Sequence, residues 1–113
     1  MDRTKTDFYS MRVTLLQTDI VWEDKQENLR LLRRKLKALR GVAEIVVLPE
    51  TFSTGFSMDS RRLAEPVSGV TIATLRQWAA EFQFAITGSY IACDEEVDAH
   101  KNAVPIPDKS YYN

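Results

Sequence analysis

Cysteine, histidine and glycine are scarce in this chain, and each scarcity excludes something. With one cysteine, Cys93, among 113 residues, no disulfide can form within the chain, which fits a reducing cytoplasm. The single histidine, His100, has no visible partners for a metal site. No glycine-rich loop follows the first apolar run, where residues 17–20 read Gln-Thr-Asp-Ile, so a small nucleotide-binding domain is disfavoured. We therefore expect neither a metal nor a cofactor.

A strong charge imbalance and a long apolar run are also missing. Fifteen basic and sixteen acidic residues give a net charge of −1, which predicts no nucleic-acid partner and no anionic membrane surface. No apolar stretch approaches the roughly 20 residues that span a bilayer. Residues 1–10 are polar, unlike a secretory signal, and we interpret them as an N-terminal extension before Met11. These features favour a cytoplasmic protein with one domain.

The remaining pattern alternates strands with helices. Short β-branched or apolar runs predict strands over residues 12–19, 44–48 and 84–92. Asp24, followed three residues later by Glu27, predicts a helix start, and Gly41 predicts the stop of that helix. A second helix is expected after Gly69. The apolar stripes of the two helices consist of Leu29, Leu32, Leu36 and Leu39, and of Ile72, Leu75, Trp78, Ala79 and Phe82. This order predicts an α/β fold in which a βαβαβ unit forms a parallel sheet.

The segment 93–113 differs from the rest. It begins with an acidic cluster, and Pro105 and Pro107 argue against regular structure nearby. Residues 108–110 read as a turn, and residues 111–113 read as a strand that has only begun. We expect an irregular tail that ends at a truncated strand, next to an open apolar sheet edge.

Glu50 is the residue most informative about function. It follows the apolar run Ile45 to Leu48, and Pro49 ends that strand because proline cannot donate to a strand ladder. The carboxylate is therefore expected at the carboxyl end of an interior parallel strand, where open α/β sheets place their ligand sites.

The sequence motifs around Glu50 resemble those of a known family. The run from Val13 to Asp19, then Trp22 and Asn28-Leu29, is followed by Ile-Val-Val-Leu-Pro-Glu-Thr-Phe at 45–52, Thr-Gly-Phe at 54–56 and Ile-Thr-Gly-Ser at 86–89. Together they resemble the N-terminal part of the nitrilase superfamily, the carbon–nitrogen hydrolases, over residues 11–92. The segment Thr-Gly-Phe-Ser-Met at residues 54–58 is most similar to the sequences of the omega-amidase-like branch. The resemblance implies one αβ layer of an αββα sandwich, with parallel strands and both helices on one face.

The resemblance also implies a chemistry. Family members use a cysteine nucleophile that forms a thioester, a glutamate general base, a lysine that stabilises the oxyanion and a second glutamate. Glu50 matches the general base, and partial burial beside the lysine would tune its pKa. The other three positions lie beyond residues 112–113 in the family pattern, so we expect this chain to be truncated and inactive alone. Phe52, Phe56 and Met58 either line the substrate site or simply pack.

Cys93 does not match the family nucleophile, and we interpret it as a small apolar side chain in the interior. A solvated helix face is expected for the basic residues of the first helix, which are Arg30, Arg33, Arg34, Lys35, Lys37 and Arg40.

Two functions remain open. The first is an omega-amidase that hydrolyses the side amide of 2-oxo acid monoamides, and the family implies a homodimer. The second is a non-catalytic interaction module that pairs or self-associates through its open sheet. A nucleotide-binding domain is less well supported than either, because no glycine-rich loop follows the first predicted strand.

Overall fold

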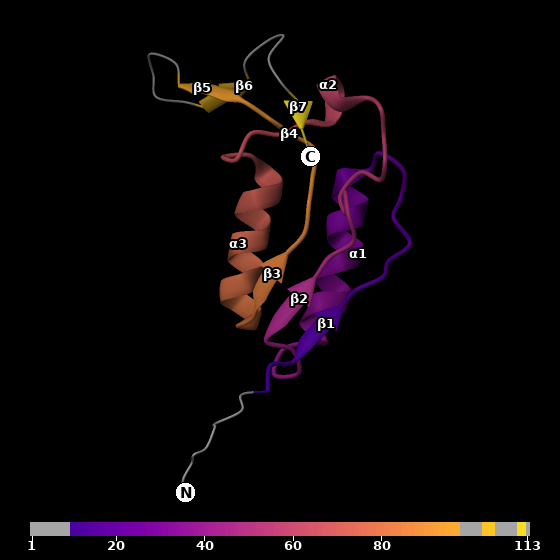
Figure 1. Ribbon diagram of the computed structural model, residues 1–113, viewed down its shortest axis with the longest axis vertical. Coiled ribbons are helices and arrows are strands. Elements are labelled where there is room, and N and C mark those ends of the chain that lie inside the picture. The colour runs from indigo at the N-terminus through magenta and orange to yellow at the C-terminus, as the bar shows by residue number, and fades with distance from the viewer. Residues whose placement is uncertain (1–9, 98–102, 106–110, 113) are drawn as a thin grey trace, which may run out of the picture.

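A three-stranded parallel sheet organises the part of the chain that the structure, a computed structural model, describes: residues 10–97, 103–105 and 111–112 (Figure 1). Its strands are β1 (Val13–Leu15), β2 (Ile45–Val47) and β3 (Ala85–Thr87), in the order β1-β2-β3. Val13 pairs with Ile45, which pairs with Ala85. The predicted parallel βαβαβ unit is confirmed. Each strand is shorter than expected, because the ladder of hydrogen bonds ends where neighbouring strands diverge into their loops.

Both long helices cover one face of this sheet, as predicted. They are α1 (Lys25–Lys37) and α3 (Val70–Phe82), and Figure 1 shows them side by side behind the strands. An ion pair between Arg33 and Glu81 joins them, with 2.7 Å between Nη2 and Oε2, and the Arg33 guanidinium lies 5.3 Å from the centre of the Phe82 ring. Right-handed crossovers that always step in one direction along a sheet leave their helices on the same face.

Local signals set where α1 begins and ends. The Asp24 side chain accepts a hydrogen bond from the Glu27 amide at 3.1 Å, which is the predicted N-cap. Helix α1 ends at Lys37, and the turn that follows reaches Gly41, whose φ of +79° is readily adopted only by glycine. A single helical turn, α2 (Ser60–Leu63), was not predicted, because one turn is too short to show an apolar period.

The hydrophobic core lies between the sheet and the two helices. Leu36 and Val46 are fully buried there, and Trp78 and Phe82 approach them from α3. Ile86 also faces the helices, since it pairs with Val46. The predicted stripes are therefore the inward faces of both helices.

The opposite face of the sheet is uncovered in the described part of the chain. Side chains alternate along a strand, so the residues on either side of Val46 point away from the helices, and the same holds on β1 and β3. Leu15 is 75% exposed and Val13 is 51% exposed. This face, which we call the open face, consists of Val13, Leu15, Ile45, Val47, Ala85 and Thr87.

The tail, expected to be irregular, contains short antiparallel strand pairs where the structure describes it. β4 (Ala92–Cys93) pairs antiparallel with β7 (Tyr111–Tyr112), and β5 (Glu95–Val97) pairs antiparallel with β6 (Ala103–Pro105). Pro105 is compatible with β6 because both strands of a two-stranded ladder are edges, where a missing amide donor is tolerated. The strand predicted at residues 111–113 is found at 111–112. The predicted extension (except residue 10), His100, Pro107 and the turn at 108–110 lie outside the described residues.

No helix in the described ranges combines the length and the apolar character needed to cross a membrane.

Candidate active site

Glu50 lies where the sequence places it, just past the end of the central strand. β2 ends at Val47, and Leu48 is still tied to the sheet because its amide donates to the Thr87 carbonyl at 2.8 Å. The Glu50 side chain is exposed, which differs from the expected partial burial. The reason is its position at the edge of the sheet, where the described elements cover the helix side of the strands and not their ends. A carboxylate at this edge is accessible to a ligand.

The residues after Glu50 form a tight turn. Thr51 has a φ of +46°, which is unusual for a β-branched residue, and it is 3% exposed. Its carbonyl accepts hydrogen bonds from the amides of Thr54 at 3.1 Å and Gly55 at 2.9 Å. Gly55 itself has a φ of +81°. We call residues 50–55 the Glu50 turn; a backbone held in such conformations needs surrounding contacts to persist.

The end of β3 supports the Glu50 turn from one side. The Thr51 amide donates to Ser89 Oγ at 3.1 Å, and the Phe52 amide donates to the Ser89 carbonyl at 3.3 Å. Gly88 permits this approach, because a Cβ there would lie 3.0 Å from Leu48 Cβ and 3.2 Å from Phe52 Cδ1. The carboxyl ends of β2 and β3 are thus joined directly at the candidate site.

Asn28 supports the turn from the other side. This α1 residue is 5% exposed, and its amide group donates to the carbonyls of Val21 at 2.7 Å and Ser53 at 2.8 Å. Its side-chain oxygen accepts from the Val21 amide at 2.7 Å. The Glu23 amide adds a hydrogen bond to the Thr54 carbonyl at 2.8 Å. The loop after β1 and the Glu50 turn are therefore joined by the buried Asn28 side chain and by this backbone hydrogen bond.

A polar network fixes the next part of the loop. The Glu23 carboxylate accepts hydrogen bonds from Ser57 Oγ and from Arg62 Nη2, and the Arg62 Nε donates to Asp59 at 2.7 Å. The hydrogen bond to Asp59 raises the pKa of Arg62 above its ordinary value. The segment from Phe56 to Asp59 is anchored by this network to the loop that follows β1.

A second carboxylate, Glu65, joins the starts of both helices. Its oxygens accept hydrogen bonds from the amide of Thr71, at 2.9 Å, and from the Thr71 hydroxyl, and Lys25 Nζ lies 3.0 Å from Oε2. Burial raises the pKa of Glu65, but the hydrogen bonds from Thr71 and Lys25 outweigh it, so the pKa lies below its usual value. An ionised carboxylate at the N-terminus of α3 also interacts favourably with the helix dipole.

The three predicted substrate contacts lie in different surroundings. Phe52 is 3% exposed and belongs to the core, where it packs beneath the Glu50 turn. Phe56 is 69% exposed and Met58 is 96% exposed. Cys93 is buried on β4, which agrees with its interpretation as a small interior side chain. Only Phe56 and Met58 therefore have side chains accessible to a substrate.

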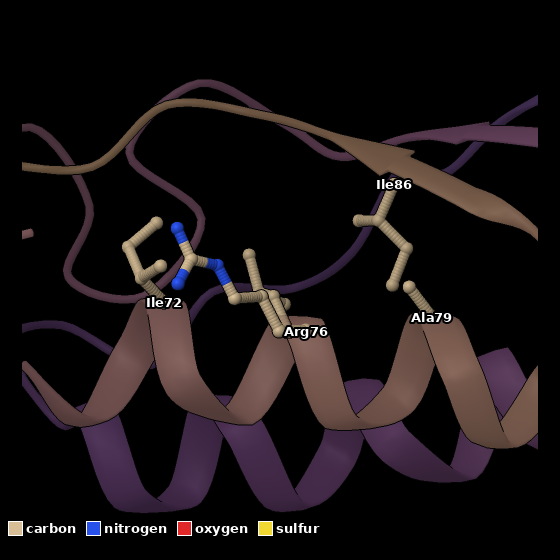
Figure 2. Close-up of a pocket in the computed structure, with 5 residues that line it drawn as sticks. Ile72, Arg76, Ala79 and Ile86 are labelled. Carbon is tan, nitrogen blue, oxygen red and sulfur yellow. The ribbon is translucent and has the colours of Figure 1, made fainter. Parts of the chain in front are cut away.

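A surface groove of about 270 Å³ lies elsewhere, between α3 and β3 (Figure 2). Figure 2 shows Ile86 reaching from β3 toward Ala79, with the guanidinium of Arg76 beside Ile72. Leu75 completes the lining. None of the predicted site residues lines it, so this groove is separate from the candidate site.

Asn28 and Ser89 have no role that the sequence pattern alone predicts. A buried asparagine beside the leucine stripe of a helix is a usable signal, because a buried amide requires hydrogen-bond partners. Ser89 lies two residues past the end of β3 and Glu50 three residues past the end of β2, and the carboxyl ends of adjacent parallel strands meet at one edge. Both signals become specific only once the strand order is known.

Comparison with known proteins adds independent findings. The family model described as carbon-nitrogen hydrolase matches residues 12–110. An omega-amidase YafV from Yersinia enterocolitica is 39% identical over 80 residues, which cover 71% of this chain and 30% of that protein. An omega-amidase YafV from Escherichia coli K12 is 42% identical over 50 residues, or 44% of this chain and 19% of that protein.

A solved structure is similar to the fold as a whole. A CN-hydrolase superfamily protein from Xanthomonas campestris, solved with an arsenic adduct in its active site, matches with a TM-score of 0.72 and 31% identity. The match covers 93% of this chain and 40% of that one. The chain thus spans less than half the length of each of these relatives.

Proposed function

The chain belongs to the carbon-nitrogen hydrolase family and is omega-amidase-like, and on that premise we propose that Glu50 is the general base of an amide-hydrolysing site. The observation that carries the proposal is the Glu50 turn, which holds an accessible carboxylate at the carboxyl end of the central strand and is joined to both neighbouring loops. A base that must meet a reacting group needs this combination of access and fixed position.

The proposed substrates are 2-oxo acid monoamides, whose side amide is hydrolysed to a carboxylate and ammonia. Glu50 takes the proton of a cysteine thiol, and the thiolate attacks the amide carbon. The protonated Glu50 then returns this proton to the leaving nitrogen, so that ammonia departs and a thioester remains. Water, deprotonated by Glu50, attacks the thioester and releases the acid, and the thiol regains its proton. The nucleophile, the oxyanion lysine and the second glutamate are family residues that this chain does not supply at matching positions, so we expect residues 1–113 alone to be inactive.

Within this proposal the exposed side chains beside the turn contact the substrate. Phe56 and Met58 extend from the segment that the Glu23 network anchors, and their exposure supports a role in the wall of the site. Phe52 supports the turn from the core instead. The even balance of lysine and arginine against acids supports a small-molecule substrate over nucleic acid, and the single cysteine supports a cytoplasmic location.

The open face supports a second candidate, an interaction module. Its β1 side chains Val13 and Leu15 are exposed, and exposed apolar patches of a few hundred Å² commonly mark interfaces. In this candidate the chain self-associates or binds a partner through the open face without catalysis. The proposed homodimer of the hydrolase is compatible with either candidate.

A chimera tests the catalytic proposal. The 80-residue segment that matches the Yersinia enterocolitica omega-amidase replaces the corresponding segment of that enzyme, and ammonia release from a 2-oxo acid monoamide is measured. We expect turnover in the chimera and its loss in Glu50→Gln, because glutamine keeps the shape of glutamate but cannot accept the proton. A positioned general base contributes about 10²–10⁴-fold.

Two controls make the result interpretable. The matched variant Glu27→Gln, which changes a half-buried glutamate of α1 that pairs with Arg30, should keep its turnover. Size-exclusion chromatography and near-ultraviolet circular dichroism should show that Glu50→Gln folds like its parent. Turnover retained by Glu50→Gln would reject Glu50 as the base.

A further inference from the structure

The peptide group that follows Glu50 is held by a side chain from the neighbouring strand end. This peptide carries the Thr51 amide, which donates to Ser89 Oγ at 3.1 Å. The next amide, of Phe52, donates to the carbonyl of the same serine at 3.3 Å. Ser89 therefore contacts two consecutive amides of the Glu50 turn, one through its side chain and one through its backbone.

The backbone of Thr51, which these hydrogen bonds hold, has an unfavourable conformation. Thr51 is buried and has a φ of +46°, so its backbone is in a region that β-branched residues rarely adopt. The orientation of the peptide between residues 50 and 51 sets the direction in which the Glu50 side chain leaves the backbone. A hydrogen bond to that peptide thus fixes the Glu50 Cα through one rigid plane, and with it the point from which the side chain extends.

The packing around Gly88 makes the hydrogen bond possible. A Cβ at Gly88 would lie 3.0 Å from Leu48 Cβ, closer than ordinary contacts, so any other residue would push the end of β3 and the Glu50 turn apart by a few tenths of an ångström. The adjacent Ser89 is thereby brought within hydrogen-bond distance of Thr51. Gly88 supplies the approach and Ser89 supplies the acceptor.

We propose that Ser89 is a positioning residue for Glu50, whose hydroxyl fixes the direction of the carboxylate by accepting the Thr51 amide. This inference rests on the proposed role of Glu50 as general base. Misplacement of a catalytic group by about 1 Å can cost on the order of 10²-fold in rate, so a residue that touches no substrate can still control turnover.

The test compares Ser89→Ala with Ser89→Thr in the active chimera. Ser89→Ala should lower kcat by about 10–100-fold and leave KM within about twofold, because the base is misdirected while substrate contacts remain. Ser89→Thr keeps the hydroxyl and should restore most of kcat. The control Thr71→Val removes another buried hydroxyl, which donates to Glu65, and should leave kcat unchanged.

A second measurement uses the 113-residue chain and needs no activity. Amide hydrogen exchange at Thr51 should be faster in Ser89→Ala than in the parent chain. Exchange at Leu48, whose amide donates to the Thr87 carbonyl, should be unchanged.

The outcomes separate this inference from the function on which it rests. Unchanged kcat in Ser89→Ala, when Glu50→Gln is inactive, overturns the positioning role alone. Loss of kcat that Ser89→Thr does not restore overturns the role of the hydroxyl, as does unchanged exchange at Thr51. Turnover in Glu50→Gln rejects the proposed base, and the positioning role with it.

Discussion

Replacing Asn28 with alanine should destabilise the chain more than any other single change at a polar residue of α1. The side chain makes three hydrogen bonds of 2.7–2.8 Å to the backbone of two loops. Ser53 is 1% exposed, so its carbonyl loses its Asn28 partner in a site with little access to water, at about 1–3 kcal/mol. Val21 is 38% exposed, and water can replace part of what its two groups lose, at about 0.5–1.5 kcal/mol each.

The sum is about 2–6 kcal/mol, a large share of the roughly 5–15 kcal/mol that stabilises a typical domain. With a denaturant slope of about 2 kcal/mol per molar urea, the unfolding midpoint of Asn28→Ala should fall by about 1–3 M. Urea unfolding followed by the fluorescence of the buried Trp78 measures this shift. The matched change Gln26→Ala, at an exposed position of the same helix, should move the midpoint little.

Asn28→Asp separates the hydrogen bonds from the shape of the side chain. It keeps the acceptor for the Val21 amide but places a carboxylate oxygen against the carbonyls of Val21 and Ser53. At neutral pH it should therefore be at least as destabilising as Asn28→Ala. A midpoint within about 0.5 M of the parent for either variant, equal to roughly 1 kcal/mol, would refute the assignment of Asn28 as the brace between the two loops.

Two other perturbations address charge and surface. Because the pKa of Glu65 is lowered in the folded chain, its contribution to stability is complete above the reference pKa of 4.5 and is lost as pH falls through the lower folded value. Glu65→Gln should therefore flatten the decline of the unfolding free energy below about pH 4.5, and an unaltered decline would contradict this. Leu15→Glu, on the open face, should reduce self-association measured by light scattering, whereas Val42→Glu, exposed elsewhere, should not. Equal masses for the two variants would show that the open face does not mediate it.

The sequence was sufficient to predict a helix or strand where the local residue pattern and the packing of the core favour the same element. The leucine spacing of α1, the cap at Asp24 and the apolar run before Pro49 each depend on neighbours in the chain, and all three predictions are confirmed. The position of Glu50 followed from them, because a strand that ends at a proline determines where the next side chain emerges. The family resemblance of the motifs around Glu50 is confirmed by the comparisons with known proteins.

Features that depend on distant partners could not be read in this way. The hydrogen bond between Thr51 and Ser89 joins residues on different strand ends, and neither residue type is unusual in a loop. The β5–β6 ladder forms in a segment whose acids and prolines argue against strands, because pairing between segments overrides local propensity. The exposure of Glu50 depends on which elements cover the sheet edge, and a one-dimensional pattern does not contain that information.

The strand order β1-β2-β3 has a consequence for how the chain acquires its structure during synthesis. β2 pairs with β1, and β3 pairs with β2, so each new strand of the parallel sheet pairs with the strand synthesised just before it. At a translation rate of about 5–20 residues per second, each helix and strand can add to the growing edge within seconds of leaving the ribosome. The apolar side chains of Leu15 and Val13 are then presented to the solvent from the first pairing onward. Nascent chains of this kind would be early clients for chaperones that recognise exposed aliphatic strands.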